Sequence, residues 1–132
     1  MYIYHLSKMV MKVKELFIVS SVLSIVFLIV YSLSKGDIQF DLLSHLFGGI
    51  SVAIVLSYLV TRFTRFGDNL TLMLLCGLVC LFEVGESYIF LYLWKELYPF
   101  YDIEYIITST NILDTTSDIL MGLVGGYLYL KI

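Results

Sequence analysis

The segment "NILDTTSDILMGLVGGYLYLKI" (residues 111–132) has the length and apolar content of a membrane-spanning helix, yet it carries Asp114 and Asp118 near its start. No Lys or Arg lies beside either aspartate. Acidic side chains are costly in hydrocarbon, and those found in membrane helices face the interior of a bundle or a water-filled cavity. The segment therefore predicts a bundle of membrane helices in which both aspartates point inward.

The composition of the whole chain is typical of a membrane protein. Of its 132 residues, 60% are hydrophobic and only 14% are charged. A soluble domain of this size has too little interior to bury so much apolar surface. No basic patch with interleaved aromatic residues is present, so we expect no nucleic-acid partner. We expect a protein of the cell membrane whose partner is the lipid bilayer, either alone or within a homo-oligomer or a larger membrane complex.

Four apolar segments are each long enough to cross the bilayer as a helix. About 20 residues are needed to cross a hydrocarbon core of about 30 Å. The segments are about residues 16–34, 42–60, 70–93 and 112–130. The sequence therefore predicts an all-α fold, in which residues 1–132 form a single transmembrane domain built as a bundle of four transmembrane helices.

The positions of the basic residues predict the orientation of these spans. Basic residues precede the first span, separate the second from the third and follow the fourth: Lys8, Lys12 and Lys14, then Arg62 and Arg65, then Lys131. The other two connections hold one lysine each, with acids nearby. Because loops rich in Lys and Arg stay in the cytoplasm, we expect both termini and the 61–69 connection to be cytoplasmic.

With this topology, the ionisable residues of the last three spans lie at similar depth in the outer half of the membrane. They form three pairs: Asp41 with His45, Glu83 with Glu86, and Asp114 with Asp118. Spacings of three or four residues put both members of a pair on one side of a helix. The sequence therefore predicts that three helices bring their polar sides together in one cluster.

Small residues lie beneath the polar pairs, on the cytoplasmic side of them in the predicted topology, and predict close helix contacts. They are Gly48 and Gly49 in the second span, Gly77 in the third, and Gly122 and Gly126 in the fourth. Glycine lets membrane helices approach closely, and two glycines four residues apart are a common contact pattern. The polar sides are therefore expected to face other helices and not lipid.

The charge of the cluster predicts a bound cation or shared protons. Carboxylates without Lys or Arg partners cannot all stay ionised in a low dielectric, and His45 can neutralise one at best. Carboxylates with an imidazole suit a divalent metal ion, and helical bundles build such centres from facing helices. The predicted metal ligands are His45, Glu83, Glu86, Asp114 and Asp118, with Asp41 as an additional ligand. A protonated or hydrated hydrogen-bond network and a proton or cation pathway are the alternatives.

Three motifs, taken in order, carry a resemblance to known families. "DLLSHLFGG" (41–49), "FEVGE" (82–86) and "DTTSDILMGLVGG" (114–126) together resemble the VanZ-like membrane proteins and the related YjdF-like family. VanZ-like sequences usually carry Glu-x2-Gln where this chain has Glu83-x2-Glu86, and an Arg before the last span that is missing here. The "DTTSD" segment is closer to the YjdF-like pattern. The resemblance implies an integral membrane protein, linked in some relatives to glycopeptide resistance or envelope metabolism, and implies no particular reaction.

Three functions are compatible with these features. One is a membrane enzyme or envelope-lipid factor with an outward-facing metal site, although the sequence identifies no catalytic residue. Another is a proton- or cation-coupled transporter, and the third is an accessory or structural subunit. A transport pathway needs polar residues that continue toward the cytoplasm, whereas the faces below Cys80 and Asp118 turn to glycine and aliphatic residues. This weighs against a transporter.

Overall fold

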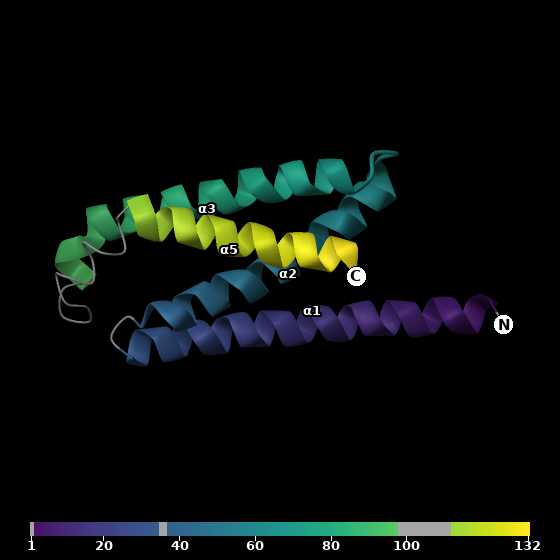
Figure 1. Ribbon diagram of the computed structural model, residues 1–132, viewed down its shortest axis with the longest axis horizontal. Coiled ribbons are helices and arrows are strands. Elements are labelled where there is room, and N and C mark those ends of the chain that lie inside the picture. The colour runs from purple at the N-terminus through teal and green to yellow at the C-terminus, as the bar shows by residue number, and fades with distance from the viewer. Residues whose placement is uncertain (1, 35–36, 98–111) are drawn as a thin grey trace.

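The computed structural model describes the backbone of residues 2–34, 37–97 and 112–132, and the side chains of residues 12–34, 37–88 and 113–132. The described residues form four helices and no strand (Figure 1): α1 (Tyr2–Leu33), α2 (Ile38–Phe63), α3 (Asp68–Leu97) and α5 (Ile112–Lys131). The prediction of an all-α fold is confirmed. The helices begin or end several residues beyond most of the predicted spans, because hydropathy marks the hydrocarbon core whereas backbone hydrogen bonding continues into the polar ends.

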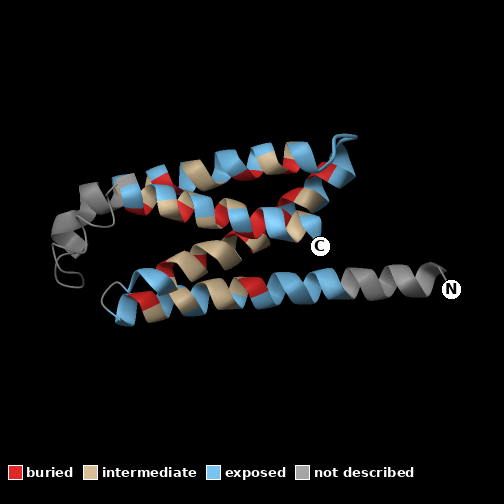
Figure 2. Cartoon of the chain, in the orientation of Figure 1, coloured by how far each residue is buried: buried red, intermediate tan, exposed pale blue. Residues whose placement is uncertain are grey.

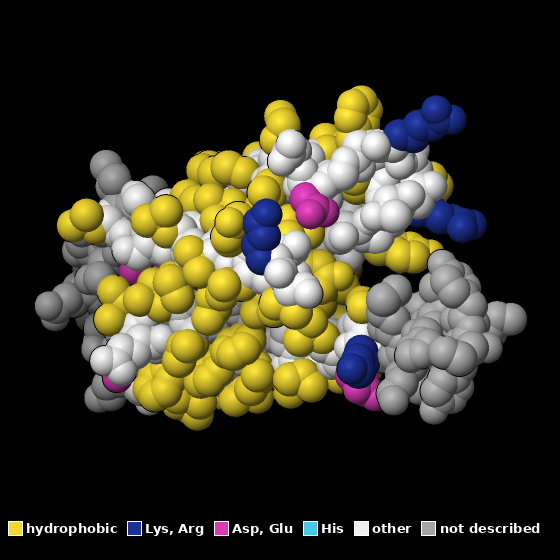
Figure 3. Space-filling model, turned by 45° about the vertical axis from the view of Figure 1, so that its right-hand side comes forward, with side chains coloured by type: hydrophobic (Ala, Val, Ile, Leu, Met, Phe, Trp, Pro, Cys, Tyr) yellow, Lys and Arg dark blue, Asp and Glu magenta, His cyan; other side chains and the backbone are white. Residues whose placement is uncertain are grey.

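Three of the helices are long and apolar enough to cross a membrane. They are α1 over Lys12–Leu33, α2 over Ile38–Phe63 and α3 over Asp68–Tyr88. Large apolar side chains such as Ile18, Ile25 and Leu81 are exposed on their outer faces. Figure 3 shows mainly hydrophobic side chains across the face in view. An apolar surface this extensive is the expected surface of a protein that contacts lipid.

Helix α2 is the centre of the arrangement. It contacts α1, α3 and α5, and α5 also contacts α3. Within the described residues, α1 packs against α2 alone, along the outer side of the bundle (Figure 1). The buried residues accordingly lie mostly on α2 and α5, whereas most of α1 is exposed (Figure 2).

Short polar segments set the ends of α2. The side chain of Asp37 accepts a hydrogen bond from the backbone N–H of Gln39, 3.1 Å away, and so caps the start of the helix. At the other end, the Thr64 hydroxyl donates to the carbonyl of Val60. Residues 64–67 then lead directly into α3, whose first residue, Asp68, is favourably placed at a helix N-terminus. This short connection makes α2 and α3 antiparallel neighbours.

Glycine brings α2 and α5 into backbone contact. A Cβ atom built on Gly49 would overlap the backbone of Gly122, and one built on Gly125 would overlap the carbonyl of Leu46. A Cβ on Gly126 would overlap the side chain of Leu75. At Gly49 and Gly125, where the neighbours are backbone atoms, only glycine permits the observed approach of the helices.

The other two glycines of the predicted packing set lie elsewhere. Gly48 faces α1, where a Cβ would lie 3.2 Å from Ser24 Oγ. Gly77 is exposed and a Cβ there would meet nothing within 4 Å, so the packing role predicted for Gly77 is wrong. Gly77 lies six residues from Glu83, which is roughly 120° around an α-helix. The packed side of α3 is instead the side that carries the fully buried Leu75.

A set of hydrogen bonds between serines joins α1 to α2. We call it the serine ladder, and it consists of Ser20, Ser21, Ser24, Ser44 and Ser51. The hydroxyls of Ser24 and Ser44 each donate to the carbonyl of the other residue, both at 2.9 Å. Further along, Ser20 Oγ lies 2.8 Å from Ser51 Oγ. Hydroxyl pairs of this kind hold membrane helices together where packing of apolar groups alone gives little driving force.

Candidate functional site

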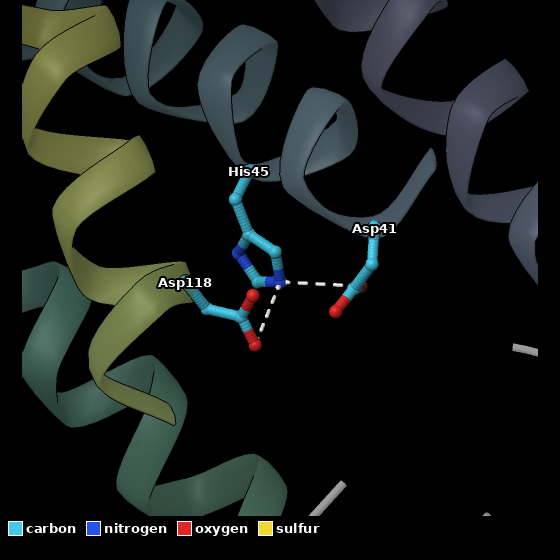
Figure 4. A group of neighbouring side chains, drawn as sticks. All are labelled: Asp41, His45 and Asp118. Atoms are coloured by element: carbon cyan, nitrogen blue, oxygen red, sulfur yellow. Dashed lines mark ion pairs between the residues drawn. The ribbon is translucent and has the colours of Figure 1, made fainter. Parts of the chain in front are cut away.

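His45 lies at the centre of the polar cluster and meets a carboxylate from each of three helices. Its Nε2 atom is 3.5 Å from Asp41 Oδ1 on α2 and 3.5 Å from Asp118 Oδ2 on α5. Its Nδ1 atom is 3.2 Å from Glu83 Oε1 on α3. Figure 4 shows the side chains of Asp41, His45 and Asp118 directed toward one another. The two ring nitrogens therefore face different partners.

Helix geometry explains why these side chains meet. Asp41 lies one turn before His45 on α2, so both side chains share a face. One turn after His45 comes Gly49, and one turn after Asp118 comes Gly122, which touch backbone to backbone. The glycine contact brings the two helices close enough for His45 to reach Asp118 across the interface.

The carboxylates of the site are deeply buried. The exposed fractions of Asp41, Glu83 and Asp118 are 5%, 3% and 4%. Within the part of the chain that the structure describes, Glu83 Oε1 and Asp118 Oδ1 have no hydrogen-bond partner, since the approach of His45 to Glu83 lacks hydrogen-bond geometry. A buried acceptor without a partner costs about 1–3 kcal/mol, and more if it is charged. These oxygens are therefore positioned to receive a cation or a proton.

Two groups of side chains have the spacing of metal ligands, and both include His45. One consists of Asp41, His45 and Asp118, and the other of His45, Glu83 and Glu86. In each group, one ligand atom per residue lies within 4.8 Å of the others. The structure thus has carboxylate and imidazole groups positioned to bind a metal ion.

Most of the ligands predicted from the sequence belong to one of these groups. His45, Glu83, Glu86 and Asp118 do, and so does Asp41, which the sequence suggested only as an additional ligand. The predicted ligand Asp114 does not. It is buried on α5, one turn from Asp118 toward the start of the helix, and lies outside both groups.

A cleft of about 650 Å³ adjoins the cluster and was not expected from the sequence. It lies between α1 and α3, with α2 beneath it, and its apolar walls include Leu28, Val52 and Phe82. Glu83, Glu86 and His45 line the cleft at the end nearer the α1–α2 connection, whereas Asp41 and Asp118 do not line it. The serines of the first span were the sequence signal that could have indicated a polar contact here. Ser24 lies four residues after Ser20 and lines the cleft.

Comparison with protein-family models, with curated proteins and with solved structures found no match. The resemblance to the VanZ-like and YjdF-like families therefore stays a prediction from three short motifs. Because a fold class alone does not determine a function, the function has to be argued from the geometry of the site.

Proposed function

We propose that this protein binds a divalent metal ion within the membrane, at Asp41, His45 Nε2 and Asp118. The two faces of the His45 ring carry the proposal. Nε2 is directed at two carboxylates from different helices, while Nδ1 is 3.2 Å from Glu83. In metal sites the ligating imidazole commonly donates its other N–H to a carboxylate, which fixes the tautomer and the orientation of the ring. Asp41 and Asp118 lie on the Nε2 side of the ring and Glu83 on its Nδ1 side, which is the order of groups in this pattern.

Charge favours the same assignment. One divalent ion offsets two carboxylates, and at this position it would also provide a partner for the unpartnered Asp118 Oδ1. Carboxylate oxygen and imidazole nitrogen are ligands shared by Mn²⁺, Fe²⁺ and Zn²⁺ sites. Three protein ligands leave coordination positions open, which is typical of metal sites that act on a bound molecule. We therefore propose a site that serves an envelope- or lipid-related activity.

The glycine contact argues against a transport pathway through the site. Directly below His45 and Asp118, the backbones of Gly49 and Gly122 meet. Close backbone packing leaves no space between α2 and α5 for a continuous polar path toward the other end of the bundle. A site that is accessible from one side of the membrane is the better description of this geometry.

We propose further that α5 also crosses the membrane, with both termini cytoplasmic. Its packing against α2 and α3 supports this, because their contacts hold α5 within the same bundle. The two ends of the chain and the α2–α3 connection lie toward the same side in Figure 1. The α2–α3 connection carries Arg62 and Arg65, and the C-terminal end carries Lys131, in agreement with the positive-inside rule.

Cysteine labelling in whole cells tests the orientation. In a background without Cys76 and Cys80, Gln39→Cys should react with a membrane-impermeant maleimide added from outside. Phe66→Cys, at the opposite end of α2 and equally free to react by exposure, should react only after the membrane is opened. The reverse pattern would show that the orientation is inverted.

Metal analysis of the purified protein tests the site. After loading with Mn²⁺ or Zn²⁺ and removal of free ion, the wild type should retain about one ion per chain, whereas Asp118→Asn should retain almost none. Glu86→Gln is the matched control, because Glu86 belongs to the cluster but not to the proposed ligand set. A wild type that retains no metal, or an Asp118→Asn variant that retains as much as the wild type, would disprove the proposal.

A further inference from the structure

We infer that the cleft between α1 and α3 binds an amphiphile that has one apolar chain and a cationic head group rich in hydrogen-bond donors, such as an alkylammonium. The inference goes beyond the proposed metal site. It concerns Glu83 and Glu86, which line the cleft, and it does not depend on Asp41 or Asp118, which lie outside it.

The size and the walls of the cleft suit an apolar chain. Its volume of about 650 Å³ lies within the range of roughly 300–1,000 Å³ that is common for small-molecule sites. Leu28, Val52, Leu78 and Phe82 supply apolar walls from three helices. Helices α1 and α3 make no contact with each other in the described residues, so the cleft lies where a lipid-facing gap separates them.

The polar end of the cleft presents hydrogen-bond acceptors. Ser24 and Ser44 line it, and each donates its hydroxyl hydrogen to the carbonyl of the other, at 2.9 Å. Only their oxygen lone pairs remain for a ligand. Glu83 and Glu86 add carboxylate oxygens, and the ring nitrogens of His45, which also lines this end, are already directed at Asp41, Glu83 and Asp118. A ligand that matches this end must therefore donate hydrogen bonds.

The charge of the same end selects the head group. No Lys or Arg is among the described residues that line the cleft, and Glu83, which is 3% exposed, has an oxygen without a hydrogen-bond partner. His45 lines the same end, but Glu83 and Glu86 together outnumber even a charged imidazole. A phosphate head would be repelled by Glu83 and Glu86. A neutral alcohol would supply one donor and no charge. An ammonium supplies three donors and the opposite charge, and such charge-assisted hydrogen bonds are about twice as strong as neutral ones.

Binding of three matched probes tests this selectivity. Protein washed with EDTA and held in zwitterionic lipid nanodiscs would be titrated with photoactivatable dodecylammonium, dodecanol and dodecyl phosphate. We expect dodecylammonium to bind about tenfold more tightly than dodecanol, and dodecyl phosphate to bind most weakly. The cross-links should map to α1 and α3 on either side of the cleft. Equal binding of the alcohol and the ammonium, or a preference for the phosphate, would overturn the inference.

Paired variants distinguish the binding of the head group, of the apolar chain and of the metal. Glu86→Gln should weaken dodecylammonium about tenfold, whereas Asp114→Asn, a buried acid outside the cleft lining, should change it less than twofold. Val52→Phe should weaken the binding of both the ammonium and the alcohol by filling the cleft, whereas Val55→Phe, on the same helix outside the lining, should not.

Asp118→Asn should lose metal and keep dodecylammonium binding, so that failure of one proposal is distinguishable from failure of the other. Binding that survives both Glu86→Gln and Val52→Phe would place the amphiphile elsewhere.

Discussion

The contact between α2 and α5 has two halves of opposite character. In the half nearer the start of both helices, His45 and Asp118 face each other through polar side chains, beside two buried oxygens without partners. One turn further along, Gly49 and Gly122 meet through their backbones alone. The glycine half sets the distance between the helices, and the polar half uses that distance to bring ligands together. Close packing and the polar cluster thus occupy neighbouring turns of the same interface.

The largest expected effect comes from filling the glycine half. Gly122→Leu should destabilise the bundle by more than about 3 kcal/mol, because added atoms at close helix contacts force the helices apart. A Cβ at this position already comes within 3.2 Å of Val79. Gly77→Leu, which adds the same side chain to an exposed glycine, is the control and should melt like the wild type. Equal melting temperatures for the two variants in detergent would show that the glycine contact does not hold the bundle.

In the polar half, Asp118→Asn should be less stable than the wild type only when metal is present. Without metal, Asp118→Asn should be as stable as the wild type or slightly more stable, because it relieves repulsion among buried acids. With free metal at 100 times its dissociation constant, the wild type should gain about 2.7 kcal/mol and the variant almost nothing. Thermal unfolding with Mn²⁺ and with EDTA measures this difference. Loss of folding in Asp118→Asn under both conditions would mean that the aspartate is structural.

Glu83→Gln, in the same half of the interface, should reduce the metal affinity without abolishing binding. The amide oxygen would still face His45 Nδ1, but without the negative charge with which the carboxylate attracts the ring N–H. Changes to a carboxylate behind a ligating imidazole typically reduce metal affinity 10–100-fold. Metal titration followed by calorimetry should show this loss with unchanged stoichiometry. An unchanged affinity would remove Glu83 from the site, and a complete loss would make it a direct ligand.

The smallest expected effect lies outside this interface, in the serine ladder. Ser51→Ala removes the hydroxyl that meets Ser20 and Ser21, and it should cost about 0.6 kcal/mol, the typical value for hydrogen bonds between membrane helices. Ser32→Ala, which removes only a bond to the carbonyl of its own helix at Leu28, is the control. The free energies of unfolding of the two variants can be compared in a steric-trap assay or by unfolding in detergent. A loss comparable to that of Gly122→Leu would show that α1 is as important to the bundle as α5.

The sequence predicted the features that follow from the rotation and depth of a single helix. Spacings of three and four residues placed His45, Glu83 and Asp118 on inward faces, and the structure brings them together. The sequence analysis placed Asp114 among the ligands and Asp41 only as an additional one, whereas the structure groups Asp41 with His45 and leaves Asp114 out, because the choice depends on how far α5 is displaced along α2. In the structure, His45 lies level with Asp118, and Asp41 reaches the same nitrogen from one turn away on its own helix.

Other features required the packing of whole helices to be known. The cleft depends on the separation of α1 from α3, which no pattern within either segment encodes. The error at Gly77 had a simpler source, since a glycine near a polar pair was assigned to its face without regard to the angle of roughly 120° between them. Ser20 and Ser24, four residues apart on one side of the first span, are a sequence signal of a helix contact that does not involve ionisable groups.

The serine ladder has a consequence for the order in which the chain assembles. The Ser20 hydroxyl can donate instead to the carbonyl of Phe17, and the Ser51 hydroxyl to that of Phe47, both within their own helices at 3.1 Å. Serine hydroxyls in membrane helices can therefore be satisfied locally. The Ser20 hydroxyl therefore has a partner within α1 itself, before α1 packs against α2, whereas Ser21 and Ser24 donate across to α2. The cluster has no such local alternative, because α5 follows the other helices along the chain and His45 meets Asp118 only once α5 has been synthesised.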